Sequence, residues 1–460
     1  MTNKKSSLRL IHVCMLFAVA FVLAAPASAS WKEQVLYSFQ GGTNDGSVPA
    51  GGAVFDPQGN LYGATTDGGP ASCAPIGGAC GTVFQLSPPA QKGGAWTETL
   101  IYQFQGKGSN DASVPNGGLI RDAAGNLYGA TAYGGTGDCV LLGVPAGCGA
   151  VYELSPPKQK GGAWTETILY SFPTAKQGYV PNGNLVFDSA GDLFGATIFG
   201  GGKGTTCDKF YQYCGAVFKL TPPKTKGGKW TEKVLHAFSS GTDGASPNGG
   251  LVLDGKGNVY GTTYAGGIEG GVCGSGGCGA VFELRPPTKI GGVWVERVLH
   301  RFGGASDGGG PSAGVIFGGS GNLYGTTVGG GAHNSPWGTV FQLARHLNGM
   351  WTERLLYTFQ DGKDGSEPRG GLVLDSNGNL YGTATGGGTV GGGTIFRLRP
   401  TGSTWTLTVL HSFTGDPDGS WPAGSLVFDT AGSLHGTTED SGTGQACGTH
   451  GCGTVFVAEP

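Results

Sequence analysis

One unit of sequence recurs seven times along this chain of 460 residues. Each copy opens on a Trp followed eight residues later by a Phe, with mixed apolar and polar residues between them. The seven segments are 31–39, 96–104, 164–172, 230–238, 294–302, 351–359 and 405–413. Their starts lie 54 to 68 residues apart, so the repeat fills nearly the whole chain and limits the fold to architectures built from similar units.

Each copy holds four short segments typical of β-strands, as the fourth copy illustrates. Its Trp segment leads to an Asp-Gly-x-x-Pro loop at 243–247, an apolar stretch at 250–254 and Gly-Asn-Val-Tyr-Gly-Thr-Thr at 257–263. A Gly-rich loop and the segment 279–286 complete it. β-Branched and aromatic residues favour strands, and frequent Gly weakens any helix. Four strands in each of seven repeats predict an all-β fold, a seven-bladed β-propeller with antiparallel blades.

The chain ends predict how the ring closes. We assign 250–254 and its counterparts to the inner strand of each blade, and the Trp segments to the outer strand. The repeats then begin with an outer strand, 31–39, and end on a third strand, 453–458. Pairing 31–39 with the last blade completes it and closes the ring, so we expect 30–460 to form a single propeller domain.

The first 29 residues have the three parts of a secretory signal peptide. Lys4, Lys5 and Arg9 precede the apolar run Ile11–Ala25, and 25–29 reads Ala-Pro-Ala-Ser-Ala. The apolar run is shorter than the roughly 20 residues of a membrane span. We therefore expect a secreted or periplasmic protein, monomeric and without a transmembrane segment after cleavage.

The charge of the predicted mature chain argues against nucleic acid as a partner. Without residues 1–30 the 28 basic side chains fall to 25, against 31 acidic ones. Nucleic-acid binding relies on basic groups that neutralise phosphates, and this chain has an excess of acidic groups.

The ten cysteines beyond the signal peptide form five close pairs, which predicts local disulfides in an exported chain. Zinc is the alternative, but structural zinc usually needs four converging ligands. The expected pairs are Cys73/Cys80, Cys139/Cys148, Cys207/Cys214, Cys273/Cys278 and Cys447/Cys452.

The recurring Gly-Asn-Leu-Tyr-Gly-Thr-Thr, then Gly-Gly, then Gly-Thr-Val-Phe-x-Leu, resembles the GloVer tandem-repeat family of exported bacterial proteins. The best copies are 321–343 and 378–398, and the resemblance covers essentially all of the chain after the signal peptide. It identifies the repeat and implies export, but it assigns no functional residues.

Candidate binding residues lie in the loops. Strand order puts the Asp-Gly-x-x-Pro loops and the Gly-rich Cys loops on one face of the ring, where the loops vary most. Aromatic side chains beside Asn and Asp suit a sugar, through ring stacking and polar contacts, although packing against neighbouring blades is the simpler interpretation. The candidates are His333, Asn334, Trp337, Trp421, Tyr133, Phe199 and Tyr264.

The sequence indicates no catalytic residue, metal ligand or cofactor. Loops 361–365 and 416–419 faintly resemble calcium loops, but the terminal Glu is missing. The starts of the inner strands are mostly Gly, Ala, Asn and apolar residues, with Glu367 and Arg369 as the main exception.

We expect a non-enzymatic exported binding module, for carbohydrate or a cell-envelope partner. The alternatives are a lyase or hydrolase with its site at the mouth of the central channel, and a purely structural envelope protein.

Overall fold

The structure of the protein is a computed structural model. It describes residues 31–460 apart from 70–71, 74–77, 92, 142, 160, 202–213, 226, 269–270, 290, 332–335, 445 and 449–450. Trp31–Pro460 form one unit. The predicted signal peptide lies outside the described residues and stays a prediction.

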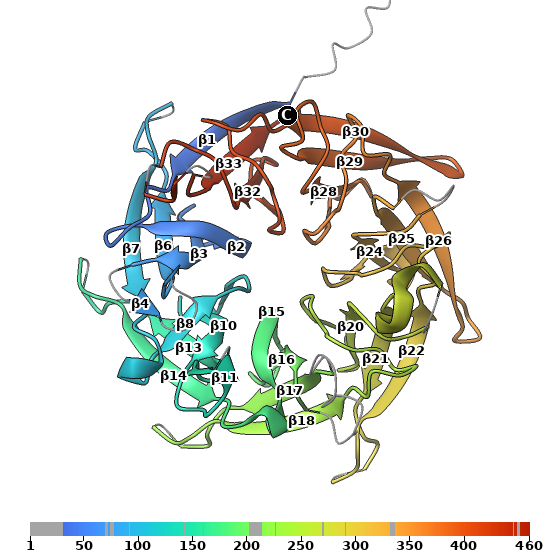
Figure 1. Cartoon of the computed structure of the whole chain (residues 1–460), viewed down its shortest axis with the longest axis horizontal. Coiled ribbons are helices and arrows are strands. Elements are labelled where there is room, and N and C mark those ends of the chain that lie inside the picture. Colours follow the sequence, from blue (N-terminus) through green and yellow to red (C-terminus); the bar gives the residue numbers. More distant parts are fainter. Residues whose placement is uncertain are drawn as a thin grey trace, which may run out of the picture. The chain divides into compact units, whose positions relative to one another are not determined.

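Seven antiparallel sheets follow one another around a ring in the unit Trp31–Pro460 (Figure 1). The Trp segments form the outer strands, and the inner strand of blade 2 is split into β8 and β9, both paired with β10. From inside to outside the strands are β2 (Gly46–Phe55), β3 (Leu61–Gly68), β6 (Thr82–Ser87) and β7 (Thr97–Gln103) in blade 1; β8 (Ala112–Pro115) with β9 (Ile120–Arg121), β10 (Leu127–Gly134), β13 (Ala150–Ser155) and β14 (Thr165–Ser171) in blade 2; β15 (Tyr179–Phe187), β16 (Leu193–Phe199), β17 (Ala216–Thr221) and β18 (Thr231–Ala237) in blade 3; β19 (Val252–Leu253), β20 (Val259–Thr263), β21 (Ala280–Arg285) and β22 (Val295–Arg301) in blade 4; β23 (Ile316–Phe317), β24 (Leu323–Thr327), β25 (Thr339–Arg345) and β26 (Trp351–Thr358) in blade 5; β27 (Val373–Leu374), β28 (Leu380–Ala384), β29 (Thr394–Thr401) and β30 (Thr404–Ser412) in blade 6; and β31 (Val427–Phe428), β32 (Leu434–Thr438), β33 (Thr454–Glu459) and β1 (Lys32–Ser38) in blade 7. The predicted seven-bladed β-propeller is confirmed.

The loops add little regular structure. Two-residue hairpins β4–β5 (Ser72–Cys73, Gly78–Ala79) and β11–β12 (Val140–Leu141, Val144–Pro145) lie in the Cys loops of blades 1 and 2. The helical turns of the described residues are η1 (Lys107–Ser109), η2 (Ala175–Gln177), η3 (Gly271–Gly276) and η4 (Gly319–Gly321).

The N-terminal strand closes the ring. β1 pairs antiparallel with β33, from Lys32 opposite Glu459 to Ser38 opposite Thr454. Blade 7 therefore takes its outer strand from the start of the chain and its other three strands from the end, as the repeat register predicts.

The blades pack on one another through a recurring pair of aromatic rings. The Phe that follows each outer strand meets a ring on the third strand of the next blade, with centroids 5.1–5.3 Å apart, edge to face in six pairs and tilted in Phe413–Phe456. In blade 1, Phe84 lies against Gly63 of β3, where a Cβ would come within 2.5 Å of the ring. This close approach explains the Gly in every Tyr-Gly-Thr or Tyr-Gly-Ala motif.

Glycine also sets how closely the blades meet at the centre. A Cβ on Gly117 would lie 2.4 Å from the carbonyl oxygen of Gly183 in the next blade. A Cβ on Gly249 would lie 2.1 Å from the nitrogen of Gly314, and one on Gly424 would lie 2.2 Å from the oxygen of Gly51. At these positions backbone therefore contacts backbone, without room for a side chain between the two blades.

A hydrogen bond joins each blade to the next beside this hub. The residue before the Pro of each Asp-Gly-type loop donates its N–H to a carbonyl of the preceding blade, over 2.8–3.1 Å at all seven junctions. At the junction of blades 7 and 1, Val48 donates to Cys452, and the Pro49 ring lies where a Cβ on Gly453 would fall. The Pro of one repeat and the Gly of the preceding one thus form a single interlocking contact.

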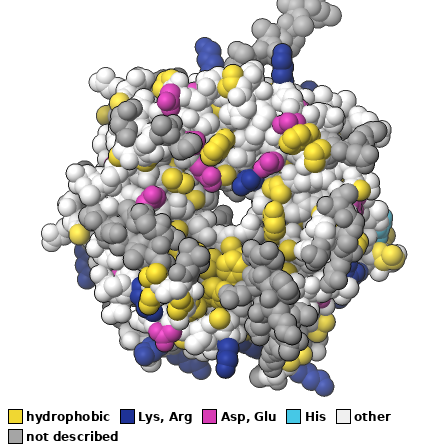
Figure 2. Space-filling model, in the orientation of Figure 1, with side chains coloured by type: hydrophobic (Ala, Val, Ile, Leu, Met, Phe, Trp, Pro, Cys, Tyr) yellow, Lys and Arg dark blue, Asp and Glu magenta, His cyan; other side chains and the backbone are white. Residues whose placement is uncertain are grey.

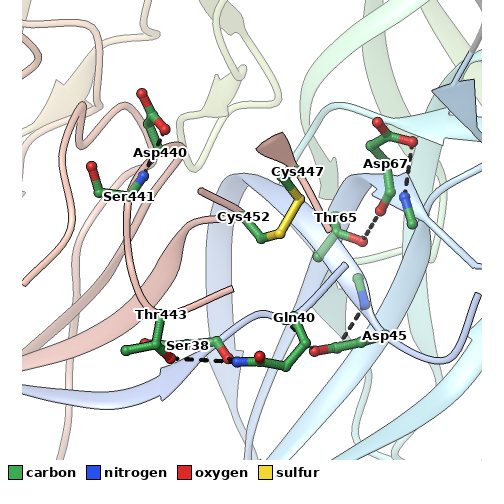
Figure 3. The surroundings of a disulfide bond; sticks show 12 residues. Ser38, Gln40, Asp45, Thr65, Asp67, Asp440, Ser441, Thr443, Cys447 and Cys452 are labelled. Carbon is green, nitrogen blue, oxygen red and sulfur yellow. Dashed lines mark hydrogen bonds between the residues drawn. A yellow bond between two sulfur atoms is a disulfide. The ribbon is translucent and has the colours of Figure 1, made fainter. Parts of the chain in front are cut away.

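The disulfides lie at these same junctions. Cys139–Cys148, Cys273–Cys278 and Cys447–Cys452 are bonded as predicted. Cys80 and Cys214 are also disulfide-bonded, while Cys207 and the side chain of Cys73 lie outside the described residues. The Cys447–Cys452 bond packs beside the segment that links β1 to β2, where Gln40 donates to Thr443 across the closing seam (Figure 3).

The disulfides fit an extracellular or periplasmic protein, because such bonds persist in oxidising compartments. No helix in the described part of the chain is long and apolar enough to cross a membrane.

The hub can be tested with one added methyl group. We expect Gly117→Ala to lower the free energy of unfolding by about 1–3 kcal/mol, because its Cβ would meet the backbone of Gly183. Gly255→Ala is the matched control, since nothing lies within 4 Å of a Cβ there. Denaturant unfolding of both variants measures the difference, and equal stability would refute the close-packed hub.

Candidate functional site

The face that carries the Asp-Gly and Cys loops has an opening at the ring centre (Figure 2). Each blade contributes two positions at its inner edge: the residue before the Pro, which is Gly310 in blade 5, and its backbone neighbour after the second strand. In blade 7, for example, Glu439 donates its N–H to the carbonyl of Trp421, and in blade 4 Tyr264 donates to Ser246. The backbone geometry is common to all blades, whereas the side chains differ.

The residue before the Pro has a positive φ in every blade, between 52° and 64°. Left-handed backbone is costly for Val and Trp, and a following Pro disfavours it further. The hydrogen bond to the preceding blade holds this conformation. The residues are Val48, Val114, Val180, Ser246, Gly310, Glu367 and Trp421.

Charge and an exposed aromatic ring gather on blades 6 and 7. Glu367 accepts a hydrogen bond from Arg369 over 2.8 Å, and both side chains are about half exposed. Trp421 is 46% exposed. Burial raises the pKa of Glu439, and nearby Arg369 opposes the rise. Thr385 of blade 6 donates to the carbonyl of Pro422 in blade 7, which holds the two blades together here.

Amide side chains occupy the next layer, on blades 2 to 4. Asn182 donates through Nδ2 to both oxygens of Asn248, and Asn184 accepts from the N–H of Gly118 over 2.7 Å. The Oδ1 atom of Asn116 is buried and has no hydrogen-bond partner. The channel wall is therefore polar on these blades, in contrast to Val114 and Val180 at the mouth of blades 2 and 3.

Two of the predicted aromatic residues, Phe199 and Tyr133, lie near the same ring, that of Tyr179. Phe199 contacts the ring of Tyr179, with centroids 5.2 Å apart. Burial raises the pKa of Tyr179, and the nearby Tyr133 raises it further. Tyr264 is 45% exposed on blade 4, where its ring lies beside Gly310 of blade 5. Trp421 stands apart from these rings on blade 7.

Trp337 occupies a structural position. Its carbonyl accepts the N–H of Glu367, as the second Cys of a pair does at other junctions. Its ring packs against a buried cluster that includes Phe359. The segment Pro-Trp337-Gly-Thr-Val-Phe aligns with Cys-Gly-Thr-Val-Phe of other repeats. This alignment could have predicted that Trp337 takes the place of the second Cys. His333 and Asn334 lie outside the described residues.

Sequence reasoning missed Glu439, Asn182 and Tyr179 as neighbours of the mouth. A signal existed for Glu439, because most other blades have Thr, Ala, Ile or Val at this place after the second strand. The Asn residues follow the Pro in three consecutive repeats, but only the structure shows that the amides of two of them, Asn182 and Asn248, contact one another.

The outer wall carries a second group of polar side chains, between neighbouring blades. Six outer strands have a Glu two residues after the Trp, and one oxygen of each is buried without a hydrogen-bond partner. Glu166 faces Asp111 of the preceding blade, and burial followed by the charge of Asp111 raises the pKa of Glu166 to about 8. The neighbouring carboxyl groups of Glu166 and Asp111 need a proton or a cation between them. The six are Glu33, Glu98, Glu166, Glu232, Glu296 and Glu353.

At five of the six junctions, the Asp of the loop that follows the preceding outer strand lies near the Glu. At three junctions a Tyr of the outer strand donates its phenol to the loop Asp, as Tyr102 does to Asp111 over 3.0 Å. His236, His300 and His411 take the place of Tyr, and His300 contacts Asp307 over 3.2 Å. These histidines therefore make the contact with the loop Asp that Tyr makes at three other junctions.

The sequence matches the family described as the Gloeobacter/Verrucomicrobia repeat over residues 25–273, 140–346 and 272–460. The chain belongs to the Gloeobacter/Verrucomicrobia repeat family. No curated protein matches it.

Solved structures resemble this Gloeobacter/Verrucomicrobia repeat protein only in fold. A Trichoderma reesei enzyme of carbohydrate-active family AA12, in its calcium structure, is 14% identical with a TM-score of 0.41, covering 94% of this chain and 96% of that one. A Dyadobacter fermentans protein of unknown function is 13% identical with a TM-score of 0.44, covering 94% and 98%. Pseudomonas fluorescens PhoX in complex with vanadate is 10% identical with a TM-score of 0.44, covering 94% and 95%. Likenesses this remote carry no argument about activity.

The buried Glu residues predict how stability depends on pH. A pKa raised above the ordinary 4.5 in the folded state means that the folded protein binds more protons, so stability falls as pH rises from about 4.5 towards 8. Over this pH range, we expect the free energy of unfolding of Glu166→Gln to fall by about 1 kcal/mol less than that of the wild type, allowing for solvent screening. Urea unfolding at several pH values measures it.

Glu459→Gln is the control for this prediction. Its side chain is exposed at the end of β33, so the pH profile should stay that of the wild type. An unchanged profile for Glu166→Gln would contradict the argument.

Proposed function

We propose that this protein is an exported, non-enzymatic binding module that holds a carbohydrate at the mouth of the channel, on the loop face. The observation that supports this most is the half-exposed Trp421, whose backbone pairs with that of Glu439, near the ion pair of Arg369 with Glu367. An exposed ring on a strained but fixed backbone offers a rigid flat surface for a sugar ring. Carboxylate oxygens and a guanidinium beside it supply acceptors and donors for hydroxyl groups.

The arrangement around the ring favours an extended ligand over a small one. Trp421 on blade 7, Tyr264 on blade 4 and the Tyr133–Tyr179–Phe199 group on blades 2 and 3 border different parts of one face. Hydrophobic side chains lie on several sides of the opening in Figure 2. A polysaccharide could contact more than one group at once, which would add their contributions.

Export rests on two observations. The N-terminal 29 residues have the composition of a signal peptide, and the disulfides fit an oxidising compartment. A module in such a compartment would meet cell-envelope or environmental polysaccharides.

One observation favours a second candidate, a lyase or hydrolase at the same place. Glu439 is a largely buried carboxyl with a raised pKa near a second carboxyl, Asp440, and a pair of such groups can exchange protons with a substrate. Incubation of each bound polysaccharide with the protein, followed by assay of new reducing ends or unsaturated products, tests this. Products that disappear in Glu439→Gln would establish it.

Binding at the mouth is tested by removing its ring. The purified protein would be screened on a glycan array and against insoluble polysaccharides, and each hit measured by calorimetry. We expect Trp421→Ala to weaken binding about tenfold or more, because truncation of a central aromatic contact costs about 1.4 kcal/mol or more.

Leu347→Ala is the matched control, because Leu347 is a fully exposed apolar side chain in the loop between β25 and β26, on the other face. It should bind like the wild type. Absence of any glycan ligand, or equal binding by both variants, would reject the proposal and turn attention to a protein partner.

A further inference from the structure

The junction of blades 6 and 7 brings a His, an Asp and a Glu side chain closer together than any other junction among the described residues. His411 lies on β30 and Asp418 in the loop that follows it, whereas Glu33 comes from β1, at the opposite end of the chain. One ligand atom from each of these residues lies within 4.8 Å of the other two. Among the described residues, this is the one trio of His, Cys, Asp or Glu side chains that meets so closely.

The distances leave a small space bounded by one nitrogen and two carboxylates. His411 Nε2 lies 3.1 Å from Asp418 Oδ1 and 4.0 Å from Glu33 Oε2. Two ligand atoms of a tetrahedral ion lie about 3.4 Å apart when each bond to the ion is about 2.1 Å long. Small shifts of the three side chains would therefore bring their ligand atoms to the separations that such an ion needs.

A second observation points to a missing partner. The Glu33 side chain is only 8% exposed, and its Oε1 is buried without a hydrogen-bond partner. A buried ionised carboxylate needs a counter-charge, and the second carboxylate beside it adds repulsion. Thr414 donates its N–H and its hydroxyl to Asp418 Oδ2, over 2.7 and 3.0 Å. This orients the carboxylate and leaves Oδ1 towards His411.

We propose that Glu33, His411 and Asp418 bind a divalent transition-metal ion of the zinc type. Imidazole with carboxylates suits such ions, whereas calcium and magnesium prefer oxygen ligands alone. A neutral imidazole and two carboxylates balance the two positive charges. Binding displaces the His411–Asp418 hydrogen bond and releases any proton held on Nε2 or on Glu33.

The ion would fasten the closing strand to blade 6. β1 completes blade 7 by pairing with β33, so the outer edge of the ring depends on a strand far from its partners in sequence. A cross-link between Glu33 and the loop at Asp418 closes a very long loop of chain, which restricts the unfolded state strongly. The metal should therefore raise the unfolding temperature as well as bind.

The other junctions provide natural comparisons. Tyr357 with Asp364 has Leu407 in place of the Glu, so it offers no second carboxylate. Tyr donates to the loop Asp at three junctions, as Tyr37 does to Asp45 over 2.9 Å. His411→Tyr should therefore keep the fold while removing the nitrogen ligand.

The test is calorimetric titration of the EDTA-treated, purified protein with ZnCl₂, together with thermal unfolding with and without zinc. We expect wild type to bind zinc at micromolar concentrations and to unfold at a higher temperature with it. His411→Tyr should bind one equivalent of zinc fewer than the wild type. Glu33→Gln should bind zinc at this site at least about tenfold more weakly. Tyr357→His, which adds an imidazole without the second carboxylate, should gain no equivalent.

Circular dichroism confirms that each variant is folded before titration. Zinc binding that is the same in wild type, His411→Tyr and Glu33→Gln would overturn the proposal, because the ion would then bind elsewhere. Absence of binding to folded wild type would also overturn it, in favour of a proton shared by Glu33 and Asp418.

Discussion

The contact between one Pro and one Gly at each blade junction is the constraint on which the ring depends. The Pro ring lies against a Gly of the preceding blade, and the N–H of the residue before the Pro donates to the carbonyl beside that Gly. Pro49 with Gly453 makes this contact at the closing seam, so the two chain ends join by the same contact as any other two repeats. Seven equal contacts fix the blade angle, and the glycines of the hub then permit the inner strands to touch.

This contact also explains why the channel mouth can vary. The left-handed backbone before each Pro is maintained by a hydrogen bond that involves no side chain. The position therefore accepts Val48 in one blade, Glu367 in another and Trp421 in a third. A site can be built by substitution at the mouth without loss of the ring, because stability comes from the backbone and the interblade Phe pairs. Conformational strain of this kind is common where side chains must be aimed at a ligand.

The sequence was sufficient for the fold because every signal in it is local and repeated. The Trp register gave the blade number, the unmatched strand 31–39 gave the closure, and close spacing gave the disulfide pairs that the structure describes. The candidate site was harder, since its members depend on neighbours in other blades. Trp421 was found as an extra aromatic, but Glu439 was not, because its relation to Arg369 is set by packing of blades 6 and 7. Trp337 is also an unusual residue in a loop, but its carbonyl accepts the hydrogen bond that joins two blades. An unusual residue is therefore not by itself a sign of a binding site.

Ring closure creates combinations that no single repeat contains. Glu33 stands at the start of the chain and His411 near its end, and only the pairing of β1 with β33 brings them together. Identical residue types occur at His300, Asp307 and Glu353, yet within the described part of the chain the tight trio forms only at the junction next to the seam. A closing strand that arrives from elsewhere in sequence is free to differ in position from its counterparts. The seam is therefore where a propeller built from near-identical blades can place a distinct site at little structural cost.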